Sequence, residues 1–174
     1  KEAYVSWTEH LRDNGITRQR FWGTPVPIWK CDKCGSITVI GSEEELKEKA
    51  ITKIPKDLHR PHIDSVKLKC KCGNEMSRIQ DVLDVWLDSG TTSWNCLYYP
   101  KEQKYFKEWF PAEYILEGNE HIRLWFSMLA ICSAVVFKKS CFKSAYIHGM
   151  ILDWKGMKMS KSLGNIISPY EVVN

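Results

Sequence analysis

The sequence lacks a long uninterrupted apolar run, an amino-terminal secretory signal, internal repeats and low-complexity segments. Its longest apolar stretch, Ile122 to Phe137, is interrupted by Arg123 and Ser127, so we expect neither a bilayer-spanning helix nor a membrane partner. Because no signal peptide opens the chain, its seven cysteines are expected to remain reduced. These features predict a cytoplasmic protein that uses thiols for metal binding or for packing.

Composition and charge exclude little beyond that. A chain of 174 residues can form one domain with a sizeable core, and 44% hydrophobic and 26% charged residues are typical of a globular protein. A net charge of +4 permits an anionic partner, but a solvated surface with extra lysines fits equally well. The chain begins without methionine, so we expect a fragment of a longer protein, and we expect a monomer.

The last third of the chain alternates between strand and helix patterns. A short apolar strand is predicted at 114–116, a buried helix at about 120–137 capped by Asn119, and a second strand at 145–152. A turn follows, and then Ser168 and Pro169 mark a helix start. This order predicts part of a parallel α/β sheet with right-handed crossovers.

Two closely spaced cysteine pairs indicate a metal site. Each pair is followed by glycine, which lets the backbone turn towards the sulfur atoms: Cys31-x-x-Cys34-Gly35 and Cys70-x-Cys72-Gly73. Four thiolates suit tetrahedral zinc, although Cys-x-Cys is tighter than the usual spacing. The alternative is a vestigial knuckle that has kept its thiols without a metal.

A compact cationic loop lies near the end of the chain, at Lys158-Met159-Ser160-Lys161-Ser162-Leu163-Gly164-Asn165. Two lysines three positions apart, joined largely by small residues, suit a polyphosphate, and Gly156 and Gly164, one before and one after the two lysines, would let the loop close. A solvated basic turn between a strand and a helix is the plainer interpretation. We call residues 158–165 the lysine loop.

Four segments together resemble class I aminoacyl-tRNA synthetases of the isoleucine, valine and leucine subgroup, most closely the isoleucine enzymes. The lysine loop matches the family's lysine signature letter for letter, and the resemblance covers essentially all 174 residues. The other three segments are Ile16 to Pro25, similar to the stretch that follows the editing insertion; Asp81 to Gly90, similar to Asp-Val-Trp-Phe-Asp-Ser-Gly; and Asp57 to Asp64, similar to a stretch of the archaeal and eukaryotic-type isoleucine enzymes.

The resemblance implies an α/β fold, namely the second half of a Rossmann-type parallel-sheet catalytic domain with a small zinc-ribbon-like insertion. The implied segments are 1–30, returning from the editing insertion into the catalytic domain; 31–73, the zinc-binding insertion with Cys31, Cys34, Cys70 and Cys72 as ligands; 74–112, a connective segment; and 113–174, the second half of the nucleotide-binding fold with the lysine loop.

The resemblance also implies an isoleucine–tRNA ligase in the full-length protein, which activates isoleucine with ATP and magnesium and transfers it to tRNA(Ile). Lys158 and Lys161 would be catalytic, because cations at the departing pyrophosphate stabilise the transition state more than the ground state. The implied ATP-binding residues are Lys158, Ser160, Lys161, Ser162 and His148. A satisfied core histidine is the alternative for His148.

The amino acid pocket is implied by Glu117-Gly118, at the carboxyl end of a predicted strand, where ligands bind in open α/β sheets. The implied aminoacyl-adenylate contacts are Glu117, Gly118, His121 and Trp125, with plain core packing as the alternative for Trp125. Glu120, His121 and Leu124 replace the Asp, Gln and Gly of the isoleucine pattern. A valine or leucine enzyme of the same subgroup is therefore an alternative.

A second alternative is a non-catalytic zinc-ribbon module that binds RNA and derives from a synthetase. The family's second ATP signature, His-x-Gly-His, does not occur in the sequence. The lysine loop would therefore supply half of an active site, and we expect the isolated chain to be inactive.

Overall fold

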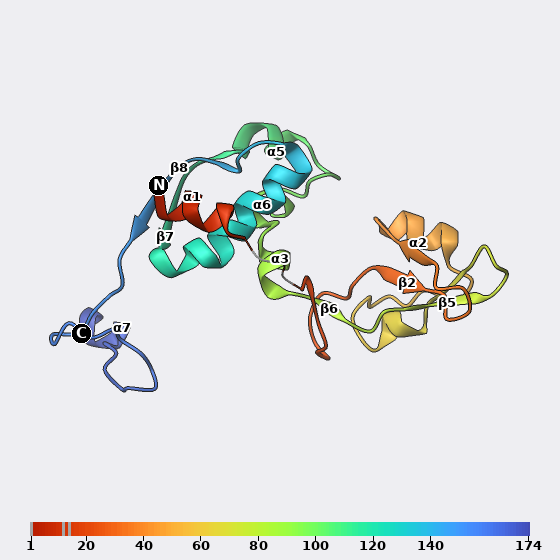
Figure 1. Cartoon of the computed structure of the whole chain (residues 1–174), viewed down its shortest axis with the longest axis horizontal. Coiled ribbons are helices and arrows are strands. Elements are labelled where there is room, and N and C mark those ends of the chain that lie inside the picture. The colour runs from red at the N-terminus through yellow and green to blue at the C-terminus, as the bar shows by residue number, and fades with distance from the viewer. Residues whose placement is uncertain (1, 12, 14) are drawn as a thin grey trace. The chain divides into compact units, whose positions relative to one another are not determined.

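The computed structural model describes residues 2–11, 13 and 15–174 (Figure 1). It divides into two compact units, which are described separately. The cysteine unit comprises Leu11–Ser89, and the parallel-sheet unit comprises Lys1–His10 and Gly90–Asn174. Over the described residues, every helix is too short or too polar to cross a membrane.

The cysteine unit is built mainly from short antiparallel strands. Four of them form one sheet in the order β3-β2-β5-β4, and β1 pairs with β6 in a separate two-stranded sheet. Its elements are β1 (Thr17–Arg18), β2 (Ile28–Lys30), β3 (Ile37–Val39), α2 (Glu43–Lys49), the 3-10 helix η1 (His62–Ser65), β4 (Lys67–Lys69), β5 (Glu75–Arg78), β6 (Val82–Leu83) and α3 (Val85–Ser89).

The core of this unit surrounds Trp29, whose ring is almost fully buried and whose Nε1 donates to the Val66 carbonyl at 2.8 Å. The helix predicted within 42–50 is confirmed as α2, since the Ser42 hydroxyl caps it by accepting from the Glu45 N–H at 3.1 Å. Burial of apolar side chains from both the sheet and α2 gives the unit a core of its own. Its buried members are Trp29, Cys31, Ile40, Leu46, Ile63, Val66, Leu68, Cys70 and Met76.

The parallel-sheet unit contains two longer strands and several helices. β7 and β8 pair in parallel, from Ala112 opposite Phe142 to Gly118 opposite His148, as the strand–helix–strand order predicts. Its elements are α1 (Glu2–Glu9), α4 (Thr92–Asn95), α5 (Lys104–Trp109), β7 (Ala112–Gly118), the 3-10 helix η2 (Asn119–Arg123), α6 (Trp125–Phe137), β8 (Phe142–His148) and α7 (Pro169–Val173).

Aromatic rings hold the helices of this unit together. The Phe126 ring of α6 lies between Tyr4 of α1 and Phe142 of β8, at centroid distances of 5.1 and 5.0 Å. A second group of rings joins α4, α5 and the end of α6, where edge-to-face and offset contacts add to simple burial. Its members are Trp94, Tyr99, Phe106, Phe110 and Phe137.

The helix predicted over 120–137 is wrong at its start. Asn119 is the first residue of η2 and not the N-cap of α6; that position is held by Leu124, which at φ −125° and ψ −120° interrupts the helical path before α6 begins. The expected burial on all sides is also wrong, because Val135 and Val136 are exposed near the end of α6. The buried face follows the ordinary spacing of three to four residues, at Phe126, Leu129, Cys132 and Ser133.

Candidate functional site

The four paired cysteines converge in the cysteine unit. Cys31 follows β2 and Cys70 follows β4, and the ligand atoms of Cys31, Cys34, Cys70 and Cys72 all lie within 4.8 Å of one another. The Sγ atoms of Cys34 and Cys70 are 3.5 Å apart, and those of Cys31 and Cys72 are 3.6 Å apart. Thiolates around one zinc ion, at about 2.3 Å each, would be about 3.8 Å apart. The thiols therefore fit a tetrahedral ion.

The glycines after each pair shape this cluster. Gly35 has φ +72° and Gly73 has φ +87°, a region that favours glycine. Their N–H groups turn back to the Cys31 and Cys70 carbonyls at 2.9 and 3.0 Å. Both turns bring the second cysteine of a pair close to the first, at the Cys-x-Cys pair as at the Cys-x-x-Cys pair.

Two polar side chains that the sequence patterns did not single out contact the exposed thiols. Asn74 Nδ2 lies 3.3 Å from the Cys72 sulfur, and its hydrogen bonds lower the pKa of Cys72 to about 6. Ser36 Oγ lies 3.1 Å from the Cys34 sulfur and lowers the pKa of that thiol. Because metals bind thiolates, these contacts favour the form that a zinc ion requires.

The backbone of the lysine loop is held in place by two residues for which no catalytic or binding role was predicted, Asp153 and Asn165. Asn165 accepts from the Ser160 N–H at 2.9 Å and donates to Asp153 at 2.8 Å. Asp153 also accepts from the N–H groups of Met157 and Lys155, and these hydrogen bonds, led by that from Asn165, lower its pKa. An Asp followed by a glycine turn, with an Asn twelve residues later, is the signal that could have identified them.

Within this frame the cationic side chains stay open to solvent. Lys158, Lys161 and Ser162 are exposed, and the Ser160 and Ser162 hydroxyls are 3.0 Å apart. Gly156 and Gly164 have φ of +76° and +66°, so both ends of the loop use turns that favour glycine. The loop therefore presents two exposed ammonium groups on a backbone that the Asp153 and Asn165 hydrogen bonds hold together.

Two of the predicted ATP contacts, one at the end of β8 and one in the lysine loop, share a pocket of about 320 Å³. His148, at the end of β8, and Lys158 both line it, while Ser160, Lys161 and Ser162 are not among its lining residues. The His148 Nδ1 is 2.7 Å from the Gly149 carbonyl, which fixes the ring as a hydrogen-bond donor at that nitrogen. The remaining lining residues are Glu120, Gly149, Met150, Ile151, Met159, Ile166 and Ile167.

The predicted adenylate contacts lie at the neighbouring strand end. Gly118 is opposite His148 in the parallel register, so the carboxyl ends of β7 and β8 meet at the same edge. Glu117 Oε2 is 3.8 Å from His121 Nδ1, and the Gly118 N–H donates to the same carboxylate at 3.3 Å. Trp125 begins α6 and is partly exposed; like Glu117, Gly118 and His121, it does not line the 320 Å³ pocket.

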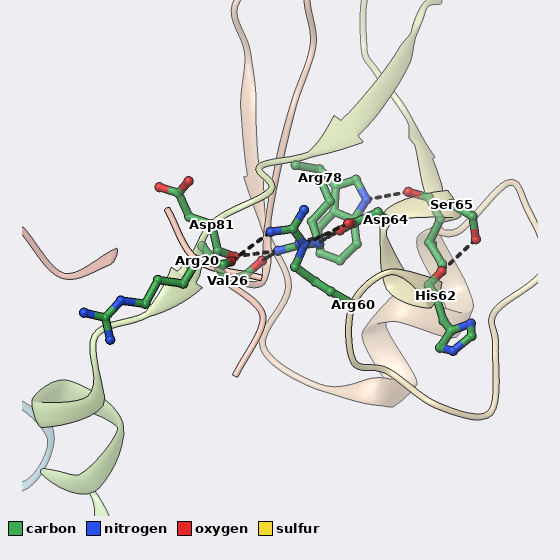
Figure 2. Close-up of polar contacts among 10 residues, drawn as sticks. Arg20, Val26, Arg60, His62, Asp64, Ser65, Arg78 and Asp81 are labelled. Atoms are coloured by element: carbon green, nitrogen blue, oxygen red, sulfur yellow. Dashed lines mark hydrogen bonds and ion pairs between the residues drawn. The ribbon is translucent and has the colours of Figure 1, made fainter. Parts of the chain in front are cut away.

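A buried ion cluster lies elsewhere in the cysteine unit (Figure 2). Asp64 receives the Nε groups of Arg78 and Arg60 at 2.8 and 3.0 Å, and Arg78 makes a second, very short contact with it through Nη2. The Nη1 of Arg78 donates to the carbonyls of Val26 and Asp81 at 3.1 and 3.0 Å. The buried guanidinium of Arg78 on β5 thus contacts η1, the segment just before β2 and the segment just before β6.

The comparison with protein families decides the relationship. The model described as tRNA synthetases class I (I, L, M and V) matches residues 1–174. The chain belongs to the class I tRNA synthetases. As the mixed strand and helix order suggests, it has the α/β fold of their catalytic domain.

Individual relatives of this class I synthetase chain are isoleucine–tRNA ligases of methanogenic archaea. The chain is 46% identical to that of Methanosarcina barkeri over 171 residues and 48% identical to that of Methanosarcina mazei over 170 residues, in each case 98% of this chain and 16% of the relative. For Methanothermobacter thermautotrophicus the identity is 46%, over 99% of this chain and 17% of the relative. The chain thus spans about a sixth of the length of these curated relatives.

A solved class I structure is also similar. The agnB2 LeuRS of Agrobacterium radiobacter K84, crystallised as a ternary complex with tRNA and LeuAMS, aligns with a TM-score of 0.66 at 28% identity. The alignment covers 99% of this chain and 25% of the LeuRS chain. The fold similarity therefore extends across both units.

Proposed function

We propose that this chain is part of an isoleucine–tRNA ligase, an enzyme that activates isoleucine with ATP and transfers it to tRNA(Ile). The observation that carries the proposal is the 46–48% identity to isoleucine–tRNA ligases across 98% of the chain. The leucine enzyme of known structure is 28% identical over a similar span, which favours isoleucine over leucine.

In this proposal the chain contributes the second half of the Rossmann-type nucleotide-binding fold and a small metal-binding insertion. Residues 1–30 lead from the editing insertion back into the catalytic domain, and 31–73 form the metal-binding insertion. Residues 74–112 are a connective segment of the catalytic domain, and 113–174 form the second half of the nucleotide-binding fold with the lysine loop. The parallel β7–β8 pair lies almost wholly within 113–174, while the antiparallel sheet around the cysteines extends beyond 31–73, because β2 and β5 lie just outside that segment.

The chemistry assigned to the lysine loop is electrostatic. The isoleucine carboxylate attacks the α-phosphorus of ATP, and pyrophosphate leaves with the electrons of the broken phosphoanhydride bond. Lys158 and Lys161 would stabilise the charge that builds on the departing oxygens, while Ser160 and Ser162 donate hydrogen bonds. Magnesium accompanies ATP as part of the substrate. His148, in the same pocket as Lys158, would orient the nucleotide.

The residues proposed to bind the amino acid and the adenylate lie at and just after the end of β7. Glu117 would contact the amino group of the adenylate, Gly118 would allow close approach of the ligand, and His121 lies beside the Glu117 carboxylate. Trp125 would contact the isoleucine side chain. The ATP and adenylate residues then act from one edge of the parallel pair, because Gly118 and His148 are register partners.

We also propose that Cys31, Cys34, Cys70 and Cys72 hold a structural zinc ion. The spacing of the sulfur atoms fits four-coordinate zinc, and four thiolates leave no open position for a substrate. The ion would contribute folding free energy to the cysteine unit and take no part in catalysis.

The test is ATP–pyrophosphate exchange by a full-length protein that contains this chain, with isoleucine, valine and leucine as separate substrates. We expect isoleucine to be preferred, and Lys158→Ala or Lys161→Ala to lower kcat by about 10²- to 10³-fold, the cost of removing one transition-state contact. Lys155→Ala, a neighbouring exposed lysine outside the signature, is the control and should leave kcat nearly unchanged. Preference for valine or leucine, or no effect of either lysine, would refute the assignment.

The 174-residue chain by itself is expected to show no exchange above background, because the sequence contains no His-x-Gly-His string to complete the phosphate site. Exchange by the isolated chain near the full-length rate would contradict the half-site proposal without affecting the preference for isoleucine.

A further inference from the structure

Two neighbouring aromatic side chains of the cysteine unit project into solvent. Phe21 is 59% exposed and Trp22 is 68% exposed, although large rings gain most from burial. Each ring nevertheless has a partner on one face. The Trp22 ring is stacked on His59, with centroids 4.9 Å apart and an interplanar angle of 10°, and the Arg60 guanidinium lies 5.4 Å from the Phe21 ring centre. We call Phe21, Trp22, His59 and Arg60 the aromatic platform.

The lower layer of the platform is held in place before any ligand arrives. Asp57 accepts from the His59 backbone N–H at 2.9 Å and lies 2.8 Å from the His59 Nδ1. Arg60 is fixed by Asp64 and donates through Nη1 to the Arg20 carbonyl at 2.9 Å, a contact that also joins the two halves of the platform. The exposed rings therefore rest on an ordered base, which lowers the entropic cost of stacking a ligand on them.

The charge around the platform is positive. Segments 16–22 and 56–62 together contain one acidic residue, Asp57, and four basic ones: Arg18, Arg20, Lys56 and Arg60. Arg18 pairs with Asp84 at 2.7 Å and Arg60 with Asp64, so the exposed charge comes mainly from Arg20 and Lys56. The Arg20 side chain extends away from the ion cluster (Figure 2). An anion beside the rings would meet this charge.

We propose that the aromatic platform binds an unpaired nucleotide of single-stranded RNA. The base stacks on the open face of Trp22, and Arg20 contacts the adjoining phosphate. A nucleotide carries a flat base and a phosphate a few bonds away from it, and an open ring with an exposed cation two residues earlier in the chain can meet both groups. The proposed ligase function names an RNA substrate but assigns it no contact on the cysteine unit. The inference therefore extends that function and can be tested without it.

The test measures binding of a fluorescein-labelled, 12-nucleotide single-stranded RNA to the 174-residue chain by fluorescence anisotropy. Stacking of one base is worth about 1–3 kcal/mol, so Trp22→Ala should weaken binding by about 5- to 150-fold. Trp22→Phe, which retains a ring, should lose less. Trp109→Ala removes a tryptophan on α5 that is 66% exposed, and should change the dissociation constant less than twofold.

A second arm tests the charge. Removing one phosphate contact with Arg20→Gln should reduce the slope of log K against log salt by about 0.7. His59→Ala, which leaves Trp22 in place but removes the ring beneath it, should weaken binding less than Trp22→Ala does. Circular dichroism spectra matching the unchanged protein establish that each variant is folded.

Three results would overturn the proposal. They are failure of the unchanged chain to bind the RNA, equal losses in Trp22→Ala and Trp109→Ala, and binding that inorganic polyphosphate displaces while Trp22→Ala leaves the RNA affinity unaltered. The last result would mean that charge alone attracts the RNA. None of them bears on ATP–pyrophosphate exchange, so failure here is distinguishable from failure of the ligase assignment.

Discussion

At the scale of the single residue, Asp64 is the position where one substitution should cost the most. Its carboxylate is the counter-ion of Arg78, whose side chain is 1% exposed, and of Arg60. Replacing it with asparagine keeps the volume but leaves a buried guanidinium without its opposite charge. Breaking a buried pair in this way costs about 3–5 kcal/mol.

We therefore expect Asp64→Asn to lower the free energy of local opening in β4 and β5 by about 3 kcal/mol or more. Hydrogen exchange of the amides over 67–78 measures this quantity without requiring the two units to unfold together. Lys49→Gln is the control, because it removes the surface pair with Glu45 on α2 and should cost less than about 1 kcal/mol. Equal protection in the two variants would mean that the ion cluster does not hold the unit together.

The same carboxylate predicts a pH dependence. Burial alone would raise the pKa of Asp64, but hydrogen bonds from Arg78 and Arg60 outweigh burial and hold its pKa below the ordinary value. The stabilisation is therefore complete above the unfolded-state pKa of about 3.9, and it is lost as the pH falls through the lower folded-state pKa. Below about pH 4 the protein should lose stability more steeply than Asp64→Asn does, as followed by thermal unfolding. Parallel pH profiles would contradict this.

Residues whose chemistry lies in a local spacing could be predicted from the sequence, and residues defined by a contact could not. The four cysteines were predicted as one site, and their sulfur atoms converge. Asp64 and Arg78 are fourteen positions apart in segments without a shared motif, so only the fold reveals their pairing. Asn74 is an intermediate case for prediction. It lies directly after the Cys70-x-Cys72-Gly73 segment, but its side chain contacts the Cys72 sulfur only once the turn has formed.

At the scale of the element, periodicity predicted which segments are regular but not where they begin. The helix α2 begins where its cap and acidic first turn predicted, because a local side-chain hydrogen bond defines that boundary. The start of α6 is set instead by the end of β7 and by Leu124, and no local signal marks it. Likewise β8 spans Phe142–His148 rather than the expected 145–152, and Leu152 forms an isolated bridge with Lys158.

The lysine loop carries a prediction of its own at this scale. Asn165 joins Ser160 to Asp153 across the loop, so Asn165→Ala should free the backbone between them. We expect amide exchange at Ser160 to accelerate at least tenfold, because its N–H loses the acceptor. Asn165→Asp keeps an acceptor for the Ser160 N–H but sets a second carboxylate against Asp153 where the 2.8 Å hydrogen bond was, so it should also accelerate exchange at Ser160.

The matched control for the loop is Asn174→Ala at the end of α7, which removes an asparagine side chain outside the Asp153 network. If the Ser160 amide exchanges at the same rate in the unchanged protein, the two Asn165 variants and Asn174→Ala, the Asn165 hydrogen bonds do not order the loop. Exchange measured by mass spectrometry over 157–166 resolves the two outcomes and requires no catalytic activity.

At the scale of the whole molecule, the division into two units has a thermodynamic consequence. The cysteine unit has a buried core whose members include Cys31 and Cys70, so metal ligands and core packing share the same residues. The parallel-sheet unit is held by aromatic contacts around α6 that involve none of the four clustered cysteines. Loss of the proposed zinc should therefore destabilise one unit and leave the other unaffected.

We expect one zinc per chain by elemental analysis, reduced to less than about half in Cys31→Ser and Cys34→Ser, because three thiolates hold the ion far less tightly than four. Cys96→Ser, at an exposed cysteine of the parallel-sheet unit, should retain full zinc.

A chelator should then increase hydrogen exchange over 28–40 and 67–78 while exchange over 112–118 and 142–148 stays constant. Two other outcomes would contradict this picture in different ways. Uniform loss of protection would mean that the units fold together, and unchanged protection with the zinc removed would mean that the packing around Trp29 is sufficient without the ion.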